Sequence, residues 1–197
     1  MAAWASTAFV GRRRELELLE AEIREAVGGQ GGTVLLAGDA GIGKTRLVAE
    51  LAARARAAGA EPLVGRCIDL VGAEVPYLPV AEALRPLLVR QDVRTLLGSA
   101  HELRWLLPGM VLGEEHPRRR SGSPPSQLGL LEELLALLGT VAAAEPVVLV
   151  LEDLHWADRS TLDLVAFLAH NLSEQRVLLV GPTAATSCRP TIGSAGS

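Results

Sequence analysis

The chain has 197 residues, 49% of them hydrophobic, which is enough to bury one sizeable core and too few for two ordinary domains. Its formal net charge of -4 gives no global electrostatic reason to expect nucleic acid as a partner, although a basic face could lie within an acidic total. Two cysteines, Cys67 and Cys188, are too few for a disulfide framework and lack metal-ligand spacing, so we interpret both as free thiols of a reducing compartment.

The amino terminus does not resemble a secretory signal, because its arginines follow a short apolar stretch instead of preceding it. We expect residues 1–8 to be disordered. The longest apolar stretch, residues 134–144, is followed by Glu145 and Pro146 and is too short to span a bilayer. We therefore expect a cytoplasmic protein with no membrane partner.

Helical and strand-like segments alternate in the first half of the chain. Over residues 12–27 apolar residues recur at spacings of three and four, which predicts a helix that ends at Gly28 and Gly29. The next predicted elements are, in order, a strand over 33–37, a helix over 44–58, a strand over 61–67, a helix over 80–88 and a helical region over 96–107.

Residues 114–126 concentrate proline, serine, glycine and arginine, so we predict a mobile loop there. Its arginines at 118–120 could touch an anionic partner, but a solvated run of charge is the simpler interpretation, and we favour it. We assign no site to this segment.

The second half continues the alternation. A leucine-dense helix is predicted over 127–144 and a strand covered on both faces follows Pro146. Asp158, Ser160 and Thr161 offer caps for the next helix, and residues 177–180 form a fourth strand. This pattern predicts an α/β fold of three layers around a mainly parallel sheet, in one domain over residues 9–181.

A phosphate-binding loop is predicted between the first strand and the second helix. The sequence there matches GxxxxGK[ST], and its residues are Gly38, Asp39, Ala40, Gly41, Ile42, Gly43, Lys44 and Thr45. Glycines let successive backbone amides point inward, and the positive end of the following helix dipole adds to the field. Lys44 should reach the β- and γ-phosphates, and the Thr45 hydroxyl should ligate Mg²⁺.

Two acids, Glu152 and Asp153, end the third predicted strand. The carboxyl ends of strands are where open α/β folds bind ligands. One acid can hold Mg²⁺ and its neighbour can orient or deprotonate the attacking water. Asp153, His155 and Asp158 could instead form a metal cluster, but an acid paired with a phosphate loop is the more economical explanation.

Four segments in order give the chain its family resemblance: FVGR with EL, LLAGDAGIGKTRL, VPYLPVAEALRPLL, and LVLEDLHWAD followed by STLDLV. Together they resemble the P-loop ATPase domain of STAND and AAA type found in bacterial LuxR-type large regulators and related adenylate cyclases, which is similar to origin-recognition ATPases. The resemblance implies the P-loop three-layer fold, with an extra strand between the phosphate-loop strand and the acidic strand; residues 61–67 fit that place.

The resemblance also implies the ligand and its contacts. Val10 and Arg12 would lie over the adenine, which favours ATP over GTP, and Arg46 joins the residues of the nucleotide site. Mg²⁺ would be held by Thr45 and Glu152, and Glu152 and Asp153 would be the catalytic acids. The family usually has Asp and Glu at these two positions, so the resemblance implies weak hydrolysis at most.

Three functions are weighed. The first is an Mg·ATP-binding switch module of a signal-transducing regulator, the second a small-molecule kinase, and the third a non-functional gene fragment. A kinase needs an acceptor pocket and usually a lid with arginines; the sequence indicates neither, although the scattered Arg66, Arg85, Arg90 and Arg104 leave this alternative open. Direct DNA binding is not expected, because no helix-turn-helix pattern is evident.

The last residues are expected to carry no selected role. One base restored after the codon of Gly181 allows the reading Gly-Thr-Tyr-Arg-Ser-Asp-Glu-Leu, which resembles the continuation of the family past its fourth strand. We therefore expect residues 182–197 to be an out-of-frame, disordered tail, and the sensor and lid regions of the family to be missing.

Overall fold

The computed structural model describes residues 13–37, 44–67, 76–90, 93, 95, 97, 100–107 and 126–183. Residues 1–8, most of the predicted loop at 114–126 and the tail from residue 184 lie outside these ranges. The elements in chain order are α1 (Arg13–Val27), β1 (Gly32–Ala37), α2 (Lys44–Ala57), β2 (Glu61–Arg66), α3 (Leu78–Leu84), η1 (Arg85–Val89), α5 (Leu103–Leu106), α6 (Gln127–Ala144), β3 (Val147–Glu152), η2 (Leu154–Trp156), α7 (Arg159–Asn171) and β4 (Val177–Thr183).

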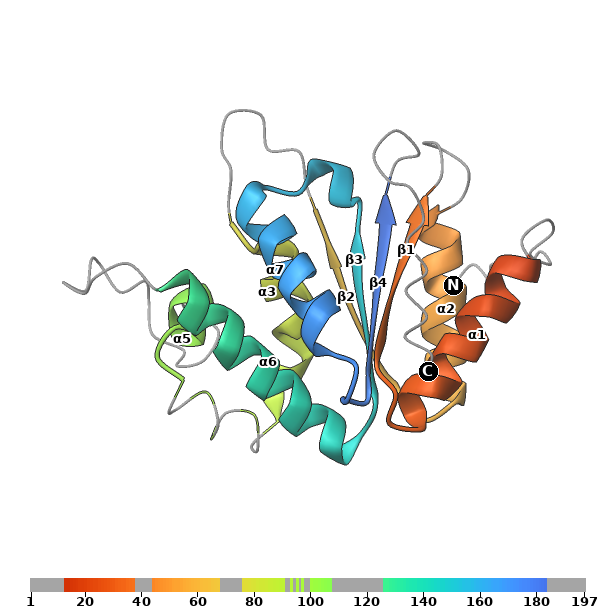
Figure 1. The fold of residues 1–197 in the computed structure, drawn as a ribbon, viewed down its shortest axis with the longest axis horizontal. Helices are drawn as coiled ribbons and strands as arrows, with labels where there is room; N and C mark the ends of the chain where they lie inside the picture. Colours follow the sequence, from red (N-terminus) through yellow and green to blue (C-terminus); the bar gives the residue numbers. More distant parts are fainter. Residues whose placement is uncertain are drawn as a thin grey trace, which may run out of the picture.

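The four strands form one parallel sheet in the order β1-β4-β3-β2, and this confirms the predicted α/β class. Helices α1 and α2 cover one face, and α3, α6 and α7 cover the other (Figure 1). Each face has its own core cluster, and β3 contributes to both because its side chains alternate between faces. All six residues of β3 are buried, as expected for a strand covered on both sides.

The strand between the phosphate-loop strand and the acidic strand is β4, so the assignment of residues 61–67 to that place was wrong. Burial gives the physical reason. Residues 177–180 of β4 are all apolar with 0% exposure, which suits an interior strand. In contrast, β2 begins at the half-buried Glu61 and ends at the exposed Arg66, which suits an edge.

The outer edge of β2 is partly covered by α3. The backbone N–H of Arg66, which faces away from β3, donates to Oε2 of Glu82 at 2.8 Å. Gly65 lies under the same helix: a Cβ there would come within 1.7 Å of the Pro79 carbonyl oxygen. The helix therefore rests directly on the β2 backbone, an arrangement that only glycine permits.

Helix α3 is shorter than the predicted helix over 80–88. It ends at Leu84, and the chain tightens into the 3₁₀ helix η1. Pro86 explains the change, since it has no N–H to donate to the carbonyl of Glu82 and its ring crowds that carbonyl.

Strand β4 runs to Thr183, beyond the predicted end at residue 180 and past the expected domain boundary at 181. Its last residues pair in register with β1, where Leu36 faces Pro182 and Ala37 faces Thr183. Gly181 fits because a Cβ there would lie 2.5 Å from Cδ1 of Leu154.

Helix α6 has the bounds predicted from the sequence. By length and composition it is the one described helix that could cross a membrane, and 39% of its residues are buried. Its buried side chains belong to the core cluster on the sheet face that α3, α6 and α7 cover. They are Leu130, Leu131, Leu134, Leu137, Leu138, Val141 and Ala142. This is the burial expected of a helix in the core of a globular domain.

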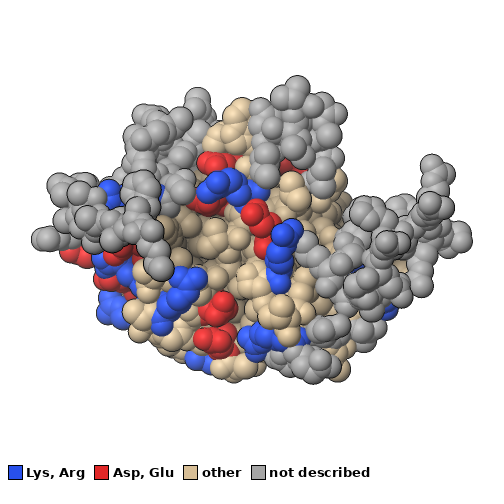
Figure 2. Space-filling model, turned by 180° about the vertical axis from the view of Figure 1, so that it is seen from behind, with Lys and Arg blue, Asp and Glu red and all other residues tan. Residues whose placement is uncertain are grey.

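Charged side chains link the two helices of the opposite face. Arg54 of α2 contacts the carboxylate of Glu20 in α1, and its Nε donates to Oε1 of Glu50 at 3.0 Å. Acidic and basic side chains are interspersed over the described part of the surface seen in Figure 2.

Candidate functional site

The carboxyl ends of the strands bring the predicted site residues to one edge of the sheet. Ala37 ends β1, Glu152 ends β3, and all four strands are parallel. Residues 38–43 follow β1 and lie outside the described ranges, as do Val10 and Arg12. The next described residues are the first of α2, so the phosphate-loop motif stands between a strand and a helix as predicted.

The start of α2 contains three of the predicted residues. Lys44 and Thr45 are helical, but their side chains fall outside what is described, and Arg46 is exposed. The structure thus places the backbone of these residues at the carboxyl edge of the sheet.

Glu152 lies on the face of the sheet that α2 covers. Val148 and Val150 of β3 pack in the same core cluster as Leu47 and Leu51 of α2. Because side chains alternate along a strand, Glu152 continues the Val148–Val150 side. Only 4% of Glu152 is exposed, so a buried carboxylate stands on the phosphate-loop side of the sheet.

The side chain of Glu152 is held by Arg66, its cross-strand neighbour. The two residues are opposite each other in the register of β2 and β3. Nη2 and Nε of Arg66 donate to Oε2 of Glu152 at 2.7 and 3.2 Å. This bonding, together with the charge of the carboxylate, raises the pKa of the Arg66 guanidinium. Arg66 was not predicted as a site residue, because the register of β2 against β3 is not visible in one sequence.

Asp153 follows Glu152 in a left-handed backbone conformation, with φ of 58°. Its carbonyl oxygen accepts the N–H of Trp156 at 2.8 Å, which closes η2. Aspartate tolerates this conformation better than most residues, and non-glycine residues with positive φ cluster at functional sites. The turn moves the half-buried Asp153 off the strand, while Glu152 stays on it.

A buried hydroxyl joins α7 to α3 beside this turn. Asp158 is the N-cap of α7, as predicted, and accepts the N–H of Thr161 at 3.0 Å. The Thr161 hydroxyl, which is fully buried, contacts the Asp158 carboxylate and accepts the N–H of Tyr77 at 3.1 Å. Tyr77 also has positive φ and is the N-cap of α3. The start of α3 and the start of α7 are thereby linked.

The alternative metal cluster finds no support among the described residues, where no group of three His, Cys, Asp or Glu side chains could hold an ion. The His155 ring instead packs against Trp156, with ring centroids 5.1 Å apart.

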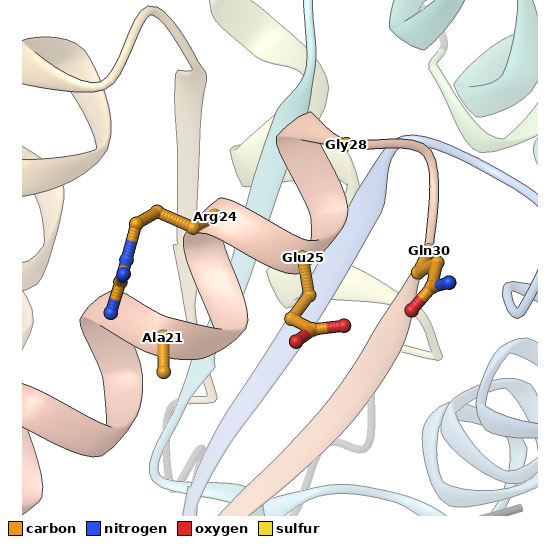
Figure 3. A pocket seen from close by; sticks show the side chains of 5 residues that line it. All are labelled: Ala21, Arg24, Glu25, Gly28 and Gln30. Atoms are coloured by element: carbon orange, nitrogen blue, oxygen red, sulfur yellow. The ribbon is translucent and has the colours of Figure 1, made fainter. Parts of the chain in front are cut away.

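A shallow hollow of about 390 Å³ lies elsewhere, around the end of α1 (Figure 3). It is lined by Ala21, Arg24, Glu25, Gly28 and Gln30. Because α1 leads into the amino end of β1, this hollow is at the opposite edge of the sheet from the phosphate-loop motif. It is not part of the candidate site.

The chain has parallel strands with helices on both faces, a GxxxxGK[ST] sequence after β1, and a buried acid at the end of β3, the next strand but one in the sheet. Together these features define a P-loop NTPase-like fold. Residues 8–180 match the AAA ATPase domain, and the chain belongs to this family. Membership implies nucleotide binding. The chain is also 28% identical to Uncharacterized protein R02095 of Rhizobium meliloti (strain 1021) over 94% of its own length. It spans about a fifth of that relative, since the match covers 19% of the longer chain.

Proposed function

We propose that this chain is the Mg·ATP-binding module of a larger signal-transducing ATPase of the STAND type, related to LuxR-type regulators. The observation that carries the proposal is the buried Glu152 on the α2 side of the sheet, at the same edge as the phosphate-loop sequence. A buried carboxylate that faces the helix after a phosphate loop has the position and chemistry of a magnesium-side acid.

The residues present fit the ligand. Backbone amides of residues 38–43 and the start of α2 would hold the phosphates, Lys44 would neutralise them, and Thr45 with Glu152 would hold the metal. When bound, Mg²⁺ neutralises charge on the phosphate oxygens. Asp153 would orient the attacking water and accept its proton.

Weak hydrolysis is part of the proposal. Asp153 has a shorter side chain than the Glu that this family usually has there, and its backbone is fixed by the turn that closes on Trp156. A carboxylate outside hydrogen-bonding distance of the attacking water accepts its proton inefficiently. The module would then act by changing shape around ATP more than by turnover, and the rest of the longer protein would supply partners and effector.

The test is ligand-induced stabilisation. Mg·ATP should raise the unfolding temperature of the wild-type chain, because a ligand at 100 times its Kd adds about 2.7 kcal/mol to the free energy of unfolding. Mg·GTP should raise it less, and the Lys44→Ala variant should lose the ATP effect while keeping its ligand-free unfolding temperature. Arg56→Ala, at an exposed position in the last turn of the same helix, is the matched control for helix stability.

Three results would contradict the proposal. Equal stabilisation of wild type and Lys44→Ala would show that ATP binds elsewhere. No stabilisation of the wild type would favour the non-functional fragment, and rapid transfer of phosphate to an added small-molecule acceptor would favour the kinase.

A further inference from the structure

We infer that Arg66 is a positioning residue for Glu152 and sets the magnesium dependence of nucleotide binding. The inference rests on the proposed function, because it assigns Glu152 to the metal side of the site. Arg66 would not contact the nucleotide; it would act through the Glu152 carboxylate that it holds.

The first step is the geometry of the pair. Both donors of Arg66 contact the same oxygen, Oε2 of Glu152, at 2.7 and 3.2 Å. The interaction itself does not use Oε1. Arg66 therefore restrains the carboxyl group through Oε2, and Oε1, which takes no part in this pair, would be the oxygen available to a metal or to a metal-bound water.

The second step is burial. The Glu152 side chain is 6% exposed and that of Arg66 is 50% exposed, so the pair joins a buried charge to solvent. A buried carboxyl group without a hydrogen-bonded partner is costly. The Arg66 guanidinium, whose Nη2 lies 2.7 Å from Oε2 of Glu152, supplies that partner.

The third step is how firmly Arg66 itself is held. Its N–H is bound by Glu82 of α3, and the following residue pairs with the same strand end, since the N–H of Cys67 donates to the carbonyl oxygen of Glu152 at 3.0 Å. The Arg66 backbone is thus fixed between α3 and β3. A guanidinium on a fixed backbone can orient a carboxylate, whereas a mobile surface arginine cannot.

The experiment compares ATP affinity with Mg²⁺ and with EDTA by calorimetry, in the full chain. We expect the wild type to bind ATP more tightly with Mg²⁺, and Arg66→Met to reduce this magnesium-dependent gain about 10- to 100-fold, the usual effect of removing a partner of a metal ligand. Affinity in EDTA should stay unchanged. Arg66→Lys, which keeps the charge, should recover part of the gain, and Arg85→Met, at an exposed position at the start of η1, should have no effect.

A double variant tests whether Arg66 acts through Glu152. In a Glu152→Gln background, Arg66→Met should cause no further loss of the magnesium-dependent gain. Manganese in place of magnesium, followed by electron paramagnetic resonance, reports metal retention directly.

The outcomes separate the two proposals. If the wild type binds ATP with a magnesium-dependent gain that Arg66→Met leaves intact, or if the variant loses affinity equally with and without Mg²⁺, the role of Arg66 is overturned and the proposed function stands. If the wild type binds no ATP under either condition, the proposed function fails and this inference fails with it.

Discussion

Arg176, the residue before β4, donates from Nε to the carbonyl oxygen of Val27, the last residue of α1, at 3.3 Å. Its Nη1 lies 3.5 Å from the carbonyl oxygens of Ala142 and Ala143 near the end of α6. One guanidinium thus donates hydrogen bonds to the carboxyl ends of two helices on opposite faces of the sheet. Carbonyls at helix ends have no partner within the helix and carry the negative end of the dipole, so a cation there is favourable.

Replacing Arg176 with methionine should lower the free energy of unfolding by about 1–2 kcal/mol, because three carbonyl contacts lose their donor. Chemical denaturation measures this directly. Arg159→Met is the control, since Arg159 is exposed and its pair with Asp163 lies within one helix. Equal effects of the two substitutions would contradict the role given to Arg176.

Alanine at Gly65 should destabilise the chain by about 1–3 kcal/mol, because its Cβ would collide with the backbone of α3, which must move away from β2. The control is Gly32→Ala, another strand position, where the nearest atom to a new Cβ is a Glu22 side-chain oxygen at 3.5 Å. The unfolding temperatures of the two variants make the comparison. A stable Gly65→Ala variant would mean that α3 packs elsewhere.

Substitutions at Asp153 should separate backbone strain from chemistry. Asn tolerates positive φ, so Asp153→Asn should unfold like the wild type, whereas Asp153→Val should lose about 1–2 kcal/mol because a β-branched residue resists the left-handed conformation. Phosphate release, where the wild type shows any, should fall in Asp153→Asn with ATP affinity retained. Equal stability of the Asn and Val variants would contradict the left-handed backbone.

The thiol of Cys67 should resist alkylation in the folded chain. Burial, followed by the nearby Asp153 carboxylate, raises its pKa to about 12 from an ordinary 9.0, so the thiolate fraction at pH 8 falls about a thousandfold. Peptide mapping after iodoacetamide treatment distinguishes Cys67 from Cys188. Fast labelling of Cys67 without denaturant would contradict its burial.

The same pKa shift has a consequence for stability. Above pH 9 the unfolded chain releases the thiol proton while the folded chain keeps it, so this group lowers the free energy of unfolding as pH rises from about 9 to 12. Below pH 9 it has no effect on the pH dependence. A Cys67→Ala variant, compared with the wild type across this window, should lack that part of the slope.

The sequence predicted elements better than their arrangement. Strand β3 and helix α6 were predicted correctly because residues 127–144 are dense in leucine and a continuous apolar run follows Pro146. The helix predicted over 80–88 was too long, because the prediction followed the spacing of apolar residues and did not take Pro86 into account. These outcomes depend on neighbours along the chain, which a sequence displays.

The arrangement of the strands depends on neighbours across the sheet, and these contacts are harder to predict from one sequence. The interior place of β4 and the edge place of β2 follow from which strand is buried on both faces, whereas the family resemblance led us to assign the interior place to residues 61–67. Glu152 was found from its position after an apolar run. Arg66 was missed because its partner is 86 residues away in the chain.

The place of β4 also has a meaning for the order of synthesis. Of the four strands it is made last, yet it stands between the strand that leads into the phosphate loop and the strand that ends at Glu152. A nascent chain that has reached residue 176 therefore has both motifs and lacks the strand that joins them. Pairing at such long range is slow to form. The nucleotide site would therefore form late in synthesis, in one step, when β4 joins the strand before the phosphate loop to the strand that ends at Glu152.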